Sequence, residues 1–155
     1  MHLLDVVTIL CTGMMTGNEL AVSFFVNPVV WQLEEPAQAM ALRLFARVGG
    51  RVMPFWYALG LILLIAETWL RWHEPSRIWL LAAVAIWVVS IVYTLLTLLP
   101  INNRIAGDKM AGLKAAELPA GWRQEHKKWD KLHQSRIAML VVAVACFSYG
   151  ILGAC

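Results

Sequence analysis

The sequence predicts an all-α protein: a polytopic membrane four-helix bundle that forms a single domain. Two observations carry this prediction. The 155 residues are 60% hydrophobic and only 15% charged, whereas soluble domains are roughly half apolar and a quarter charged. The apolar residues also gather in four stretches, each close to the roughly 20 residues that cross a bilayer core. These predicted spans cover about residues 3–26, 52–70, 78–99 and 137–154.

The connection between the first two spans, residues 27–51, is expected to contain a short amphipathic helix that lies at the membrane interface. Glu34 and Glu35 suit the positive end of such a helix, and Pro36 suits its first turn. The pair Gly49–Gly50 is typical of a helix stop. This segment therefore predicts a separate interfacial helix before the second span.

The basic residues predict the orientation in the membrane. The connections at 27–51 and 100–136 hold eleven of the thirteen lysines and arginines, and only Arg71 and Arg77 lie on the opposite side. By the positive-inside rule both connections are cytoplasmic and both termini lie outside, as in a protein of the bacterial inner membrane. The net charge of +3 is then a topology signal, and no nucleic-acid partner is expected. In the second connection a polar loop should give way to a helix from about Trp122 that enters the fourth span.

Polar residues form a stripe along the first span. They recur at intervals of three or four residues, so they share one helix face. The stripe consists of Asp5, Thr8, Thr12, Thr16, Glu19, Ser23 and Asn27. Hydroxyl residues alone could bond back to the helix backbone, but Glu19 is costly in a membrane and indicates a functional site with a partner. Gly13 and Gly17 on the adjacent face are a candidate contact for a homo-oligomer.

Candidate partners of Glu19 lie where the third span ends and the fourth begins. The third span is expected to end in a turn over residues 100–104, whose two amides and guanidinium are costly in lipid. For Arg104 a snorkelling side chain at an ordinary helix end is an equal alternative. The fourth span is preceded by polar and aromatic residues spaced three or four apart: His126, Trp129, His133 and Arg136. The prediction is a pocket near the cytoplasmic side that joins Glu19, Asn102, His133 and Arg136.

Two short motifs resemble those of the anthrone-oxygenase-like family of small four-helix membrane proteins. One is a P-x-N turn with Pro100, Asn102 and Asn103, and the other is a W-x-x-x-H-x-x-R segment with Trp129, His133 and Arg136. Asn27–Pro28 and Met53–Pro54 are also similar to the family pattern. The resemblance implies an oxygenase-like enzyme: fungal relatives oxidise anthrones to anthraquinones with dioxygen and no obvious organic cofactor, whereas many bacterial relatives have no assigned activity.

The candidate residues supply the groups that such an oxidation needs. An anthrone has an acidic C–H, and its enolate reacts with dioxygen, so the site needs a base, an oxyanion stabiliser and a dry aromatic slot. Glu19 would be the base, because desolvation makes a carboxylate a stronger base. His133 is the other candidate. Arg136, Asn102 and Asn103 would hold the oxyanion. Further substrate contacts are expected from Ser23, Arg104, Trp129, Phe24 and Phe25, although membrane aromatics commonly serve as packing or interface anchors. Dioxygen is the expected co-substrate, and no organic cofactor is assigned.

Alternatives to a cofactor-independent enzyme stay open at this point. A single metal ion could be held by Glu19 and His133. His126 and His133 cannot share an ion, because seven residues separate them by about 10 Å along one helix. The chain could instead bind or transport a quinone, a lipid or another small aromatic compound along the polar stripe, with membrane lipid around it. The outer end of the stripe discriminates between these functions: a sealed end favours an enzyme pocket, and an open end favours a transport path.

Overall fold

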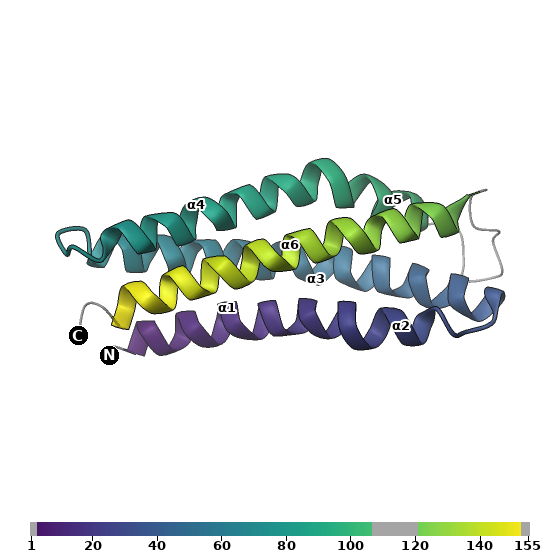
Figure 1. The fold of residues 1–155 in the computed structure, drawn as a ribbon, viewed down its shortest axis with the longest axis horizontal. Helices are drawn as coiled ribbons and strands as arrows, with labels where there is room; N and C mark the ends of the chain where they lie inside the picture. Colours follow the sequence, from purple (N-terminus) through teal and green to yellow (C-terminus); the bar gives the residue numbers. More distant parts are fainter. Residues whose placement is uncertain (1–2, 107–120, 153–155) are drawn as a thin grey trace.

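The protein is a bundle of four long helical segments (Figure 1). The structure, a computed structural model, describes residues 3–106 and 121–152. The first segment joins α1 (Leu3–Ala21), the π-helical turn η1 (Val22–Val26) and α2 (Asn27–Val30); the second is α3 (Glu35–Leu70); the third joins α4 (Arg77–Tyr93), the π-helical turn η2 (Thr94–Leu98) and α5 (Leu99–Ala106); the fourth is α6 (Trp122–Leu152). All four are long and apolar enough to cross a membrane. The predicted fold class is confirmed, and the chain is a multi-pass membrane protein.

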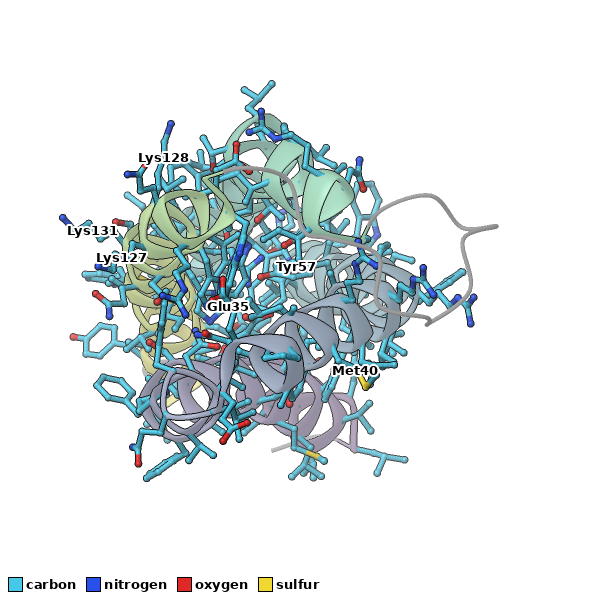
Figure 2. The ribbon with its side chains drawn as sticks, turned by 90° about the vertical axis from the view of Figure 1, so that its right-hand side faces the viewer. Glu35, Met40, Tyr57, Lys127, Lys128 and Lys131 are labelled. Atoms are coloured by element: carbon cyan, nitrogen blue, oxygen red, sulfur yellow. The ribbon has the colours of Figure 1, made fainter. Side chains whose placement is uncertain are left out.

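The bundle has two ends that differ in charge. At one end lie the start of α1, the turn between α3 and α4, and the end of α6; this is the termini end (Figure 1). At the other, the connection end, lie α2, α5 and the starts of α3 and α6. Figure 2 shows Lys127, Lys128 and Lys131 on the outer side of α6 at the connection end. The described basic residues of α5 and of the starts of α3 and α6 therefore lie at the same end, while the side of the membrane that they face stays a prediction.

The prediction of a separate interfacial helix between the first two spans is wrong. α3 begins at Glu35 with Pro36 in its first turn, as expected, but it continues for 36 residues without a stop at Gly49–Gly50. A glycine within a helix costs only about 1 kcal/mol, whereas ending the helix would leave several backbone groups without partners. At 1.5 Å per residue α3 is about 54 Å long, so it extends well beyond a bilayer core of about 30 Å.

The two π-helical turns each precede a proline. In each the closing backbone hydrogen bond spans five residues instead of four, and Pro28 or Pro100 follows within two residues. A proline ring clashes with the carbonyl four residues earlier, which belongs to Phe24 or Leu96, the middle residue of each turn. The wider turn accommodates the ring, so the helical segment continues through the proline.

This accommodation overturns the predicted turn at residues 100–104. These residues form part of α5, and the third segment is helical from Arg77 to Ala106. The expected polar loop at residues 107–120 lies outside the described residues. The expected helix from Trp122 into the fourth span is confirmed as the start of α6.

Two apolar core clusters lie inside the bundle. The smaller one, at the connection end, consists of Val30, Leu42, Ile101, Ile105 and Trp122. The larger one lies in the termini half, where α6 packs tightly against α4. Its buried members come from four helices: Met15, Tyr57, Leu64, Leu80, Ala83, Trp87, Leu140, Ala143, Phe147 and Ile151. Gly60 permits a close approach here, because a Cβ at that position would lie 2.6 Å from the Trp87 ring. By contrast, a Cβ at Gly13 or Gly17 would meet nothing within 4 Å, so this face is open and its role as an oligomer contact stays a prediction.

Candidate functional site

All seven residues of the polar stripe point into the bundle, and each is buried. Thr8, Thr12 and Thr16 each donate a hydrogen bond to the carbonyl four residues earlier, at 2.7–2.9 Å. Their hydroxyls are therefore largely satisfied within α1 itself, as expected for threonine in an apolar helix. The carboxyl groups differ, because each is bound by a side chain from another helix.

Glu19 from α1 is ion-paired with Arg136 from α6. The Nη2 atom of Arg136 lies 2.5 Å from Oε2 of Glu19, and both side chains are less than 10% exposed. A buried carboxylate is strongly destabilised unless it is paired and hydrogen-bonded, and the guanidinium satisfies both conditions. Both contacts of this carboxylate with Arg136 and His133 use Oε2, so Oε1 is outside these pairs.

His133 completes a three-residue cluster with this pair. Its Nε2 atom lies 3.3 Å from the backbone carbonyl of Glu19, and a carbonyl only accepts hydrogen bonds. Nε2 therefore carries the proton, and the bare Nδ1 accepts a 2.8 Å hydrogen bond from Nη2 of Arg136. The two hydrogens of one guanidinium nitrogen thus serve the carboxylate and the imidazole, and His133 is the neutral form.

Aromatic rings extend the cluster toward the connection end along one face of α6. Trp129 is stacked on His133, with ring centroids 4.5 Å apart and an interplanar angle of 16°. His126 is stacked on the other side of Trp129 at 5.8 Å, and Trp31 lies 5.0 Å from His126. The expectation that His126, Trp129, His133 and Arg136 share one face is confirmed by these contacts.

Arg136 also contacts α3 and the third helical segment. Its Cζ atom lies 5.7 Å from the centre of the Tyr57 ring, a cation–π contact. Its Nη1 atom is 3.5 Å from the hydroxyl of Thr94, the first residue of η2. The buried Nε atom has no hydrogen-bond partner among the described residues. The guanidinium therefore joins all four helical segments and retains an unused donor.

Several residues that the sequence placed in the site lie elsewhere. Among the described residues no hydrogen bond or ion pair connects Asn102 to the cluster, and Asn103 and Arg104 are exposed. Arg104 instead forms an ion pair with Glu125 at 3.3 Å. Phe24 and Phe25 are 63% and 72% exposed on the outside of the bundle, because they follow Ser23, which keeps the inward position of that turn.

The displaced position of residues 102–104 follows from the continuous helix. With η2 and α5 unbroken, the third segment carries these residues toward the connection end, and Thr94 lies beside Arg136 in their place. Ser23 is buried on the stripe within η1, and Trp129 is half-buried against His133. Of the sequence candidates, the structure brings Glu19, His133, Arg136 and Trp129 into direct contact.

A second buried charge cluster closes the termini end of the stripe. Arg71 pairs with Asp5 at 2.5 Å and with Glu67, and Thr8 reaches Glu67 at 3.4 Å. The carboxylates of Asp5 and Glu67 are almost fully buried. Glu67 is not among the residues predicted from the sequence, although the cost of a carboxyl group in a span, which marks Glu19, applies to Glu67 equally.

A third contact fixes the connection end of the stripe. Asn27 donates to one carboxylate oxygen of Asp130 at 2.7 Å, and the Trp31 indole donates to the other at 2.9 Å. His126 lies 3.8 Å from the first of these oxygens. Asp130 was also missed, because in sequence it is one charge within a highly charged stretch.

A metal site at Glu19 and His133 finds no third ligand in the described part of the chain. There, no group of three or more histidine, cysteine or carboxylate side chains could hold a metal ion. The guanidinium of Arg136 also occupies the position between the carboxylate and Nδ1. A metal ion bridging these two atoms would have to displace it.

Fold and site together define a four-helix multi-pass membrane protein with a buried carboxylate–guanidinium–imidazole cluster. A model of the Anthrone oxygenase family matches residues 42–146, well over half of the chain, so the protein belongs to that family. The matched region includes His133 and Arg136, whereas Glu19 precedes it. No curated protein and no solved structure matches the chain.

Proposed function

We propose that the protein is a membrane-embedded oxygenase that converts an activated methylene of a planar aromatic or phenolic substrate, of the anthrone type, into a carbonyl with dioxygen. The observation that carries this proposal is the contact of Glu19, Arg136 and His133 inside a membrane-spanning bundle. Membership of the Anthrone oxygenase family supports the reaction class.

The cluster supplies a base and an oxyanion binder side by side. Glu19 would remove a proton from the methylene through Oε1, which stands outside its contacts with Arg136 and His133. Arg136 would stabilise the enolate oxygen, because a fixed guanidinium in a low-dielectric interior acts on developing negative charge. Both nitrogens of His133 are already engaged, which favours Glu19 as the base and His133 as the group that positions it.

The proposed reaction balances with dioxygen as the only oxidant. The enolate carbon gives its electron pair to dioxygen and forms a C–O bond, and protonation gives a hydroperoxide. Loss of the second C–H proton then breaks the O–O bond, which leaves the carbonyl and releases water. The methylene carbon is oxidised by four electrons and one dioxygen is fully reduced, so no electron donor is required.

The proposal is tested by turnover of the purified full chain in lipid nanodiscs. Oxygen consumption and quinone absorbance are measured after anthrone is added, with empty nanodiscs as the control for spontaneous oxidation. Glu19→Asp keeps the counter-ion of Arg136 but withdraws the carboxylate by one methylene, so turnover should fall at least about 100-fold, within the range of general base catalysis. Glu34→Gln, at an exposed carboxylate just before α3, should leave turnover unchanged. Equal rates for wild type and empty nanodiscs would refute the proposal.

A binder or small transporter of a quinone, lipid or aromatic compound is the second candidate. The buried polar stripe from Asp5 to Asn27 favours it, because such a stripe could line a path. The ion pairs of Arg71 occupy one end of the stripe, which favours a closed site over an open path. In the same nanodiscs, saturable binding of an anthraquinone without oxygen consumption would select this alternative.

We also propose the orientation expected from the basic residues: connections in the cytoplasm, termini outside, in a bacterial inner membrane. The proposed partners are membrane lipid and a small hydrophobic aromatic ligand. Asn102, Asn103 and Arg104 lie toward the connection end, where they could contact a ligand during entry.

A further inference from the structure

Two buried hydroxyl groups beside Arg136 have no hydrogen-bond partner. The Tyr57 hydroxyl from α3 and the Ser90 hydroxyl from α4 are both shielded from solvent, and neither makes a hydrogen bond with the described protein atoms. Ser90 is fully buried and Tyr57 is 5% exposed. Buried polar groups are nearly always paired in native proteins, so each exception requires an explanation.

The two hydroxyls are close to each other, and the Tyr57 ring and Thr94 link them to the guanidinium. The Tyr57 ring lies 5.7 Å from Cζ of Arg136, and its phenol is within reach of the hydroxyls of Ser90 and Thr94. The Thr94 hydroxyl donates to the Ser90 carbonyl at 2.7 Å and faces Nη1 of Arg136 at 3.5 Å. Figure 2 shows Tyr57 inside the bundle, away from its outer surface.

The surrounding core holds the Tyr57 backbone in place. The buried indole of Trp87 donates a 3.1 Å hydrogen bond to the Tyr57 carbonyl, and the Trp87 ring is packed against Gly60. The two aromatic rings are 5.9 Å apart. The phenol is thus held by its backbone within reach of the Ser90 and Thr94 hydroxyls. Neither its hydroxyl nor that of Ser90 forms a hydrogen bond of normal geometry, so both remain available to a ligand.

All three unused groups can donate a hydrogen bond. They are the Tyr57 hydroxyl, the Ser90 hydroxyl and Nε of Arg136, and they come from three different helices. A cation with two neutral donors suits a negatively charged oxygen. Donors that are fixed before the ligand arrives need little reorganisation, which is the general requirement for stabilising an oxyanion.

We infer that Tyr57 and Ser90, together with Nε of Arg136, form the subsite that binds the phenolate or enolate oxygen of the substrate. This inference rests on the proposed function and adds Tyr57 and Ser90 to the residues of the site. It also separates the base from the oxyanion binder in space. The carboxylate of Glu19 contacts Nη2 of Arg136, whereas the Tyr57 ring contacts the guanidinium through Cζ.

The test uses a stable phenol whose colour reports its ionisation, 2-hydroxyanthraquinone, bound to the full chain in nanodiscs. Its absorbance is titrated against pH in wild type, Tyr57→Phe, Ser90→Ala and the double variant. In wild type the bound probe should ionise at lower pH than in empty nanodiscs. Each single substitution should raise that pH by about one unit, a tenfold change in ionisation constant, and the double variant should raise it further.

Controls separate this inference from a structural role and from the oxygenase proposal. Tyr57→Phe keeps the ring and the backbone carbonyl bound by Trp87, so its melting temperature should match wild type; Tyr149→Phe, at a 60% exposed tyrosine, should not alter the titration. An ionisation pH that is equal in wild type and Tyr57→Phe, or no binding of the probe, would overturn the inference. Because the probe is not oxidised, a Tyr57-dependent shift without anthrone turnover would retain the subsite and reject only the oxygenase.

Discussion

Nη2 of Arg136 bonds both to Oε2 of Glu19 and to Nδ1 of His133, at 2.5 and 2.8 Å. The Glu19–Arg136 contact joins positions 117 residues apart, so it ties the first helical segment to the last. Because His133 is the neutral tautomer, the cluster holds one negative and one positive charge. Removing either charge alone leaves the other uncompensated in the membrane interior.

Glu19→Gln should therefore destabilise the bundle as well as abolish turnover. Breaking a buried ion pair by removing one partner costs about 3–5 kcal/mol, whereas removing both charges costs less. The double variant Glu19→Gln/Arg136→Gln should accordingly regain most of the lost stability while remaining inactive. Thermal unfolding of the three variants in detergent measures this coupling. Additive losses in the double variant would show that the two charges do not depend on each other.

Arg71→Gln should produce a similar loss of stability at the termini end. The substitution leaves the buried carboxylates of Asp5 and Glu67 without the guanidinium that both contact, an effect of several kcal/mol. Arg77→Gln is the matched control at the same end, because Arg77 hydrogen-bonds at the exposed surface and such substitutions usually change stability by less than about 0.5 kcal/mol. Similar melting temperatures for the two variants would contradict the expectation.

Gly60→Ala should disturb the core, and Gly49→Ala in the same helix should not. A Cβ at Gly60 would lie 2.6 Å from the Trp87 ring, whereas one at Gly49 meets nothing within 4 Å. Overpacking of this kind typically costs about 1–3 kcal/mol, while a tolerated glycine-to-alanine change in a helix gains up to about 1 kcal/mol. The two melting temperatures should thus move in opposite directions. A rise for Gly60→Ala would mean that Trp87 can shift freely.

Reporter fusions test the orientation predicted from the basic residues. Two reporters are fused at each site: one that is active only in the cytoplasm and one that is active only after export. At Gly112 the first should give the signal, and after Cys155 the second. Exchanging the two reporters at each site provides the internal control. A cytoplasmic signal only after Cys155, with the exported signal at Gly112, would leave the four spans as observed but would reject the proposed orientation.

Gly13→Leu/Gly17→Leu tests the proposed homo-oligomer. Both positions are open within one chain, so the leucines should fit the monomer but block close approach of a second helix. Cross-linking and mass determination in nanodiscs should show a shift toward monomer, with the melting temperature of the monomer unchanged. An unaltered mass distribution would exclude this face as the contact.

The fold could be predicted from the sequence more fully than the site, because the transfer of a helix into lipid depends on the average hydrophobicity of a long segment. Four apolar stretches suffice to define four spans, and no single residue alters that result. The site depends on which individual residues are neighbours. Glu19 is recognisable in the sequence as a costly residue. That it contacts Arg136 and not Asn102 can be known only from the path of the third helical segment. That path depends on η2, whose extra backbone residue per turn has no sequence signal beyond the following proline.

Tyr57 and Glu67 illustrate the remaining difficulty. A tyrosine in an apolar helix reads as packing, and only its unpartnered hydroxyl marks it as distinct. Glu67 is identifiable as costly, but its pairing with Asp5 through Arg71 requires the register of α3 against α1. Such registers follow from side-chain packing across helices, which the pattern along one chain does not encode.

The two π-helical turns have a consequence for how a bulky planar molecule could reach a cluster that is enclosed on all sides. Each turn breaks the regular hydrogen-bond ladder just where α1 and α4 pass the cluster, and the following prolines lack an amide to restore it. Bending is cheapest where this ladder is already incomplete. The first and third helical segments can therefore bend at η1 and η2 relative to α3 and α6, which pass this level as continuous helices. Substrate would then enter laterally from the lipid, and the bilayer itself would be the reservoir that the protein samples.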